Sequence, residues 1–162
     1  MRRIIIIVVT FIVMLFSGLK SQTLNSFFKK YNGNESFESV TVNKMAFGLA
    51  MLAGDLEKDE RDVLSAMHKI KILTSKDSTL ALDYGKLMDE FEEVVKHEAL
   101  ESALSVREKG EKVDIYTKTN GTKFTDMVIA VREKDEFSLI WLNGNFDQDM
   151  VHKIQNGKML ND

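Results

Sequence analysis

Residues 112–143 read KVDIYTKTNGTKFTDMVIAVREKDEFSLIWLN, and this stretch decides the fold. Apolar and polar side chains alternate in three of its segments: 112–118, 124–132 and 136–143. Alternation with a period of two is typical of half-buried strands. Asn120-Gly121, between the first two segments, is a strong signal for a tight hairpin turn. The stretch therefore predicts a meander of antiparallel strands.

Upstream of this meander, the sequence predicts strands and helices in alternation. The expected strands are 37–44, a second around Ile70 and Ile72, and 100–107. Four helices are expected: 45–53, a short one over 59–67, the amphipathic 79–97 and a last one over 147–154. The first, 45–53, is apolar nearly all round and should be buried. We expect an α+β fold, a two-layer sandwich in which a mixed, mainly antiparallel sheet carries helices on one face. The element order is β-α-β-α-β-β-β-β-α.

The N-terminus has the three-part pattern of a secretory signal peptide. Arg2 and Arg3 precede an uncharged apolar run, Ile4 to Phe16, and small residues follow it. A membrane-spanning helix needs about 20 apolar residues, and this run is shorter. We expect cleavage after Ser21 and export through the inner membrane, to the periplasm or outside the cell. Association with the membrane would follow only if the leader stayed uncleaved.

Four segments follow from these patterns: a signal peptide over 1–21, a polar exit segment over 22–36, a single α+β domain over 37–156 and a C-terminal tail over 157–162. The net charge of −3, with no basic cluster free of acidic residues, argues against a nucleic-acid partner. The chain contains no cysteine, which excludes a lipid anchor on that residue as well as disulfides.

No catalytic motif is found in the sequence, and we expect neither an enzyme nor a cofactor. The strongest candidate metal ligands are Asp89, Glu93 and His97, which fall on one face of the predicted helix 79–97. A solvated helix face explains the same spacing more simply. The sequence lacks an HExxH motif, a GxSxG elbow and a glycine-rich phosphate loop.

The last strand of the meander carries large apolar groups on both of its faces. If Val113 and Ile115 point toward the helices, then Tyr116 lies on the opposite face of the sheet. We predict a partner-binding surface there, formed by Tyr116, Phe137, Leu139 and Trp141. Alternatively, residues 24–31 could cover Trp141 with Phe27 and Phe28, which would leave no exposed patch.

Several pieces of the sequence resemble an uncharacterised family of bacterial envelope proteins, catalogued as domain of unknown function 4252. They are Val42 to Phe47, Ile72 to Ser75, Val113 to Tyr116 and Ile140 to Phe146, within a resemblance that runs from Phe28 to Ile154. It implies a small exported α/β domain. Many members of the family are lipoproteins, and this chain departs from them because it lacks the lipid-accepting cysteine.

Together these features predict a non-enzymatic binding or sensing module of the bacterial cell envelope, with an envelope protein as its partner. An alternative is a carrier or sensor of a small apolar ligand. Its pocket would lie between helices and sheet near Met45, Met51, Met67 and Met88. Methionines at these positions could equally be core filler.

Overall fold

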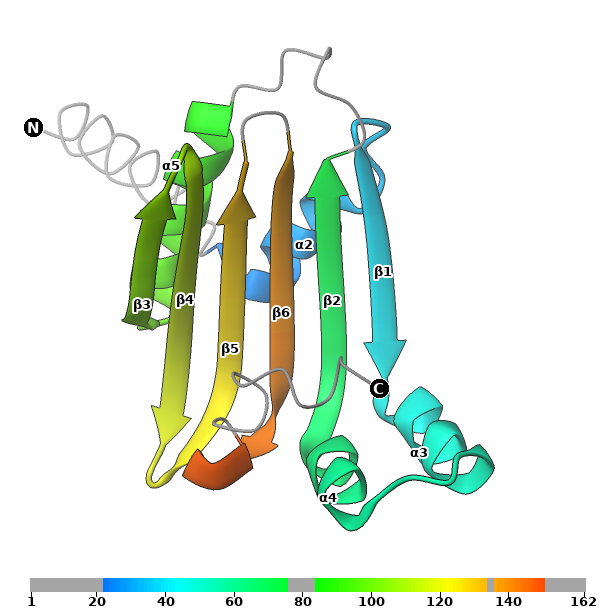
Figure 1. The fold of residues 1–162 in the computed structure, drawn as a ribbon. Coiled ribbons are helices and arrows are strands. Elements are labelled where there is room, and N and C mark those ends of the chain that lie inside the picture. The colour runs from blue at the N-terminus through cyan, green and yellow to red at the C-terminus, as the bar shows by residue number, and fades with distance from the viewer. Residues whose placement is uncertain (1–21, 76–83, 134–135, 151–162) are drawn as a thin grey trace, which may run out of the picture.

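The computed structural model describes residues 22–75, 84–133 and 136–150 (Figure 1). Its centre is a six-stranded sheet in the order β1-β2-β6-β5-β4-β3. The strands are β1 (Phe37–Asn43), β2 (Met67–Ser75), β3 (Glu101–Glu108), β4 (Glu111–Asn120), β5 (Lys123–Arg132) and β6 (Phe137–Phe146). Every pairing between neighbouring strands is antiparallel, so the expectation of a mixed sheet was wrong.

The helices are α2 (Leu24–Tyr31), α3 (Lys44–Ala53), α4 (Lys58–Ala66) and α5 (Tyr84–His97). Helices α2 and α5 lie against one face of the sheet, whereas α3 and α4 lie together at one end of it (Figure 1). The predicted α+β sandwich is confirmed, but the expectation that the helices lie on one face was wrong, because Phe47 of α3 and Val63 of α4 pack against the opposite face of the sheet. None of the helices in the described residues is long and apolar enough to span a membrane.

Helix α2 lies where we predicted a polar exit segment over 22–36, and that prediction was wrong. Leu24, Phe27, Phe28 and Tyr31 recur at steps of three and four residues and are all buried. The helix begins with a capping box in which the side chains of Thr23 and Ser26 each accept from the other's backbone N–H. The folded domain therefore begins at about Thr23 and not at residue 37.

Most other predicted elements match the structure to within a residue or two. The predicted helix 79–97 is described from Tyr84 onward. The last predicted helix begins after Asp147, whose side-chain Oδ1 accepts from the backbone N–H of Met150 at 2.9 Å. Residues 1–21 and 151–162, which hold the predicted leader and tail, lie outside the described residues.

The turn between β4 and β5 differs from the predicted Asn-Gly pair by one residue. Asn120 still pairs with Lys123, so the two turn residues are Gly121 and Thr122. Gly121 has a φ of 63°, as the first central residue of a type II′ turn requires. Only glycine adopts this conformation without a steric cost.

The two faces of the sheet carry separate apolar clusters. The first joins α2 and α5 to Leu73, Val128, Leu139 and Trp141. The second joins α3 and α4, through Phe47 and Val63, to the opposite face, where Ile115, Met127 and Leu142 lie. Val113 and Ile115 lie on this second face, away from α2 and α5. The prediction that they point toward the layer of helices formed by α2 and α5 was therefore wrong.

Candidate functional site

The predicted partner-binding surface lies in the core and not on the surface. Trp141 is 4% exposed, Phe137 and Leu139 are buried, and Tyr116 is partly buried against Phe91 with ring centroids 5.6 Å apart. The ring of Phe28 lies 5.7 Å from Trp141. The alternative in which residues 24–31 cover Trp141 is therefore correct, because helix α2 occupies this face of the sheet.

Asp89, Glu93 and His97 are all exposed along α5. Glu93 bonds to Lys96 of the same helix at 2.9 Å. Within the described ranges, no group of three or more His, Cys, Asp or Glu side chains is arranged to hold a metal ion. The structure therefore places the three candidate ligands on a solvated helix face.

Three of the four methionines of the predicted apolar pocket lie in different parts of the structure. Met88 belongs to the cluster beneath α2 and α5, and Met67 to the cluster on the opposite face of the sheet. Met45 points into solvent and is 75% exposed. The structure thus separates the residues on which the carrier hypothesis depended.

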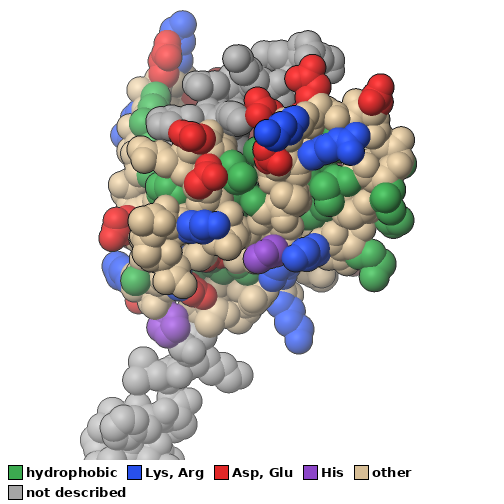
Figure 2. Space-filling model, turned by 90° about the horizontal axis from the view of Figure 1, so that it is seen from below, with side chains coloured by type: hydrophobic (Ala, Val, Ile, Leu, Met, Phe, Trp, Pro, Cys, Tyr) green, Lys and Arg blue, Asp and Glu red, His purple; other side chains and the backbone are tan. Residues whose placement is uncertain are grey.

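Among the described residues, no other element covers the outer apolar face of helix α3. Phe47 is its one buried residue, so the prediction of a buried helix was wrong. Met45, Leu49 and Leu52 follow one another at steps of four and three, and Leu49 and Leu52 are 62% and 87% exposed. We call these three residues the α3 ridge. In the view from below, apolar side chains stand out along the side where α3 lies (Figure 2).

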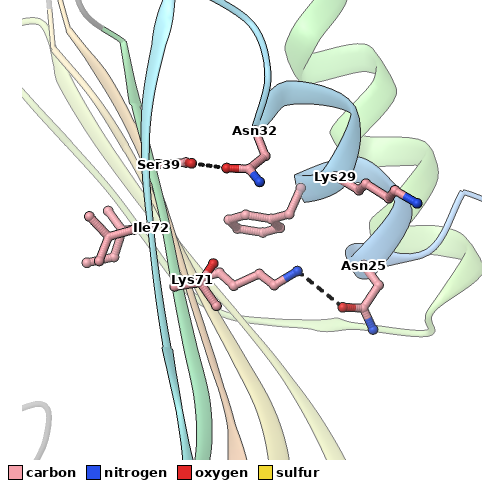
Figure 3. Close-up of a pocket in the computed structure, with 9 residues that line it drawn as sticks. Asn25, Lys29, Asn32, Ser39, Lys71 and Ile72 are labelled. Carbon is pink, nitrogen blue, oxygen red and sulfur yellow. Dashed lines mark hydrogen bonds between the residues drawn. The ribbon is translucent and has the colours of Figure 1, made fainter. Parts of the chain in front are cut away.

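A second surface feature is a groove of about 200 Å³ between α2 and the β1–β2 edge of the sheet. We call it the lysine groove. It is lined by Asn25, Phe28, Lys29, Asn32, Ser39, Val40, Thr41, Lys71 and Ile72. Lys71 points along the groove toward Asn25, and the hydroxyl of Ser39 donates to Asn32, whereas Ile72 points to the other side of the sheet (Figure 3).

Two ammonium groups converge on Asn25, which lines this groove together with Lys71. Lys69 and Lys71 project from the same face of β2 and donate to the same oxygen of Asn25, at 3.3 and 3.4 Å. The Lys69 ammonium also lies 4.6 Å from the ring centroid of Trp141. Partial burial lowers the pKa of Lys71, and the neighbouring charge of Lys69 lowers it further. In the part of the chain that the structure describes, neither lysine forms an ion pair with a carboxylate.

The partly buried polar side chains next to Trp141 form hydrogen bonds with it and with one another, which gives them a structural role. Asp126 accepts from the indole N–H of Trp141 at 2.9 Å and from the amide of Asn143 at 2.8 Å. These bonds fix the indole beneath the two lysines. A satisfied network of this kind orders a core.

Neither the α3 ridge nor the lysine groove was predicted from the sequence. Met45, Leu49 and Leu52 belong to the segment 45–53, whose apolar character nearly all round predicts burial and not an exposed face. The pair Lys69 and Lys71 was visible as the polar side of a strand. Its relation to Asn25 depends on α2, the helix that we had not predicted.

Comparison with known proteins agrees with the family resemblance. A model of the family described as domain of unknown function (DUF4252) matches residues 31–154. No curated protein and no solved structure matches the chain. The match covers β1 to β6 together with the helices between them, which is most of the described fold. The chain therefore belongs to the family of domain of unknown function 4252.

Proposed function

We propose that this protein is an exported, non-enzymatic binding module of the bacterial cell envelope, and that the α3 ridge is where it docks on a protein partner. The observation that carries the proposal is the exposure of Met45, Leu49 and Leu52 on an otherwise ordered helix. Exposing three large aliphatic side chains side by side costs solvation free energy that burial against a partner would recover.

The spacing of the ridge fits a groove on another protein. Steps of four and three residues place all three side chains on one stripe of the helix. Helices that dock into apolar grooves use anchors at this spacing. Phe47, on the opposite side of α3, packs in the second apolar cluster and holds the helix in place. The ridge is thus presented on a fixed support.

Charges near the ridge indicate the kind of partner. Helix α3 packs against α4, where residues 57–62 hold four carboxylates and two cations. An acidic flank disfavours an anionic lipid surface. It also disfavours a second copy of the chain, because two convex ridges would meet with like-charged flanks. We therefore expect a groove that is apolar inside and basic at its rim.

The test begins in intact cells, with a photo-crosslinking amino acid at position 52 to identify the neighbour of the ridge. The identified partner is then purified and titrated against the wild-type protein, Leu49→Glu and Leu104→Glu. Leu104 is a matched control because it is another exposed leucine, on β3. We expect binding to the wild type and to Leu104→Glu, and a loss of about tenfold or more in Leu49→Glu.

Three other outcomes would overturn the proposal. One is a partner that binds Leu49→Glu as tightly as it binds the wild type. Another is a crosslink only between two copies of this chain, which would make the ridge a homodimer interface. The third is crosslinking only to lipid, together with vesicle binding that Leu49→Glu abolishes.

A further inference from the structure

Two cations lie close together beside the lysine groove, and no ion pair among the described residues neutralises either of them. Lys69 and Lys71 bring two positive charges to a single neutral acceptor, the side-chain oxygen of Asn25. Like charges at short range repel, and partial burial weakens the screening by water. A strand with one lysine and one neutral residue at these positions would avoid this repulsion.

The surroundings of the two lysines supply further hydrogen-bond donors and space. Asn25 and Asn32 carry side-chain amides, Thr41 carries a hydroxyl, and all three line the groove of about 200 Å³. Thr41 lies directly opposite Lys71 in the β1–β2 pairing. The bonds from the lysines to Asn25 are long for hydrogen bonds, at 3.3 and 3.4 Å. A charged acceptor would form shorter and stronger bonds with the same ammonium groups.

A purely structural role for the lysines can be separated from a binding role. Lysine stems cover aromatic rings, and both ammonium groups lie near the ring of Trp141, at 4.6 and 5.6 Å from its centroid. Covering the ring requires mainly the aliphatic stem. Anion binding requires the charge. Methionine keeps a stem of similar length without the charge, so a lysine-to-methionine change distinguishes the two roles.

We propose that the lysine groove is a binding site for a phosphate group, held by the ammonium groups of Lys69 and Lys71 and by the amide of Asn25. Two ammonium groups match the charge of a phosphate monoester. The groove is open at the surface and shares no residue with the α3 ridge, so this site stands apart from the proposed docking of a protein partner. The phosphate could belong to a small soluble molecule or to a lipid headgroup.

The experiment titrates glycerol 3-phosphate into the purified mature protein at pH 7 and constant ionic strength, with glycerol as the uncharged control. Backbone amide shifts in nuclear magnetic resonance spectra report the site. Trp141, the single tryptophan of the chain, gives a second signal through its fluorescence. We expect saturable changes at Asn25, Lys69 and Lys71 with phosphate and none with glycerol.

Two variants with the same change of charge make the test specific. Lys71→Met should weaken binding by about tenfold or more, because it removes a charged hydrogen-bond donor. Lys44→Met, on α3 and outside the groove, should bind as the wild type does. Cooperative thermal unfolding of Lys71→Met at a temperature no lower than that of the wild type would show that the fold is intact. A Lys71→Met variant that binds as tightly as the wild type would overturn the proposal.

A parallel arm separates the two sources of phosphate. The same proteins are sedimented with vesicles of phosphatidylethanolamine that contain phosphatidic acid, a lipid whose headgroup is a phosphate monoester. Binding of glycerol 3-phosphate that Lys71→Met weakens assigns the site to a soluble phosphate. Sedimentation that Lys71→Met abolishes, without binding of glycerol 3-phosphate, assigns it to a lipid headgroup. If neither probe binds, the groove is not a phosphate site.

Discussion

Phe28 and Trp141 pack ring against ring with centroids 5.7 Å apart, although one lies near the start of the described chain and the other near its end. Phe28 is buried among residues of α2, α5 and the sheet. This contact ties α2 to the central strand β6. Helix α2 is therefore part of the folded domain and not a linker.

The Phe28→Ala variant should lower the free energy of unfolding by about 3–5 kcal/mol, because it removes a buried ring and leaves a cavity over Trp141. Leu52→Ala on the α3 ridge should change it by less than about 0.5 kcal/mol, since Leu52 is exposed. Urea unfolding followed by circular dichroism measures both. Equal effects for the two variants would show that α2 does not pack as described.

Gly144→Ala should destabilise the protein by about 1–3 kcal/mol. A Cβ at this position would lie 2.5 Å from the backbone oxygen of Ala66 and 2.5 Å from the ring of Phe146. Gly48→Ala is the matched control, because a Cβ at Gly48 meets nothing within 4 Å. Since Gly48 lies inside helix α3, alanine there should stabilise the protein by roughly 0.5–1 kcal/mol. Thermal unfolding of the two variants should therefore shift in opposite directions.

Stability should fall as the pH drops below about 4, the ordinary range of carboxyl pKa values. Burial alone would raise the pKa of Asp114, but hydrogen bonds from Lys112 and Ser105 outweigh it and hold the pKa below its usual value. Glu90 is also partly buried, and hydrogen bonds from Lys30 and Tyr31 lower its pKa in the same way. Between the folded and unfolded pKa values the unfolded chain binds more protons, so acid favours unfolding.

The contribution of Asp114 can be isolated by its isosteric variant. Asp114→Asn cannot release a proton, so its free energy of unfolding should decline less steeply than that of the wild type between pH 6 and 3. Urea titrations at several pH values give both slopes. Identical slopes would mean that Asp114 is not held ionised by Lys112 in the folded state.

The mature protein should begin at Gln22 if the leader is cleaved after Ser21, as the sequence predicts. This position suits the fold, because it preserves Thr23, the N-cap of α2, and the backbone N–H of Leu24 that donates to Glu98 at 3.3 Å. Mass spectrometry of the protein recovered from a periplasmic fraction measures the terminus. A terminus at Leu24 or beyond would remove the cap and contradict the prediction.

The positions of the strands and of the hairpin could be predicted from the sequence, but the face of the sheet that each helix covers could not. The strands were recognised because alternation survives in any context, and the hairpin because Gly121 needs a positive φ. The face of β6 was misjudged because both sides are apolar: Phe137, Leu139 and Trp141 alternate with Ile140 and Leu142. Such a pattern shows that both faces are packed, but it does not say which helix covers which face.

Helices α2 and α3 illustrate two different errors. In α2, the lysines Lys29 and Lys30 and the short length made the segment look like polar chain, although its buried residues follow helical steps. In α3, high hydrophobicity suggested burial, but burial also requires neighbouring elements that can cover the helix. At the end of the sheet, α4 and the second apolar cluster cover only the side that carries Phe47. The exposure of the α3 ridge could therefore be recognised only from the fold.

The order of the strands has a consequence for how the protein is made. Strand β6 is the last along the chain, yet it lies between β2 and β5, and its register joins Ile72 to Ile140. Until β6 has been synthesised, the β1–β2 pair and the β3–β5 meander remain two separate pieces without a shared sheet. If the chain is exported as its sequence predicts, such a delay would help to keep it extended while it threads through a translocation channel. The sheet cannot close before the residues of β6 are available.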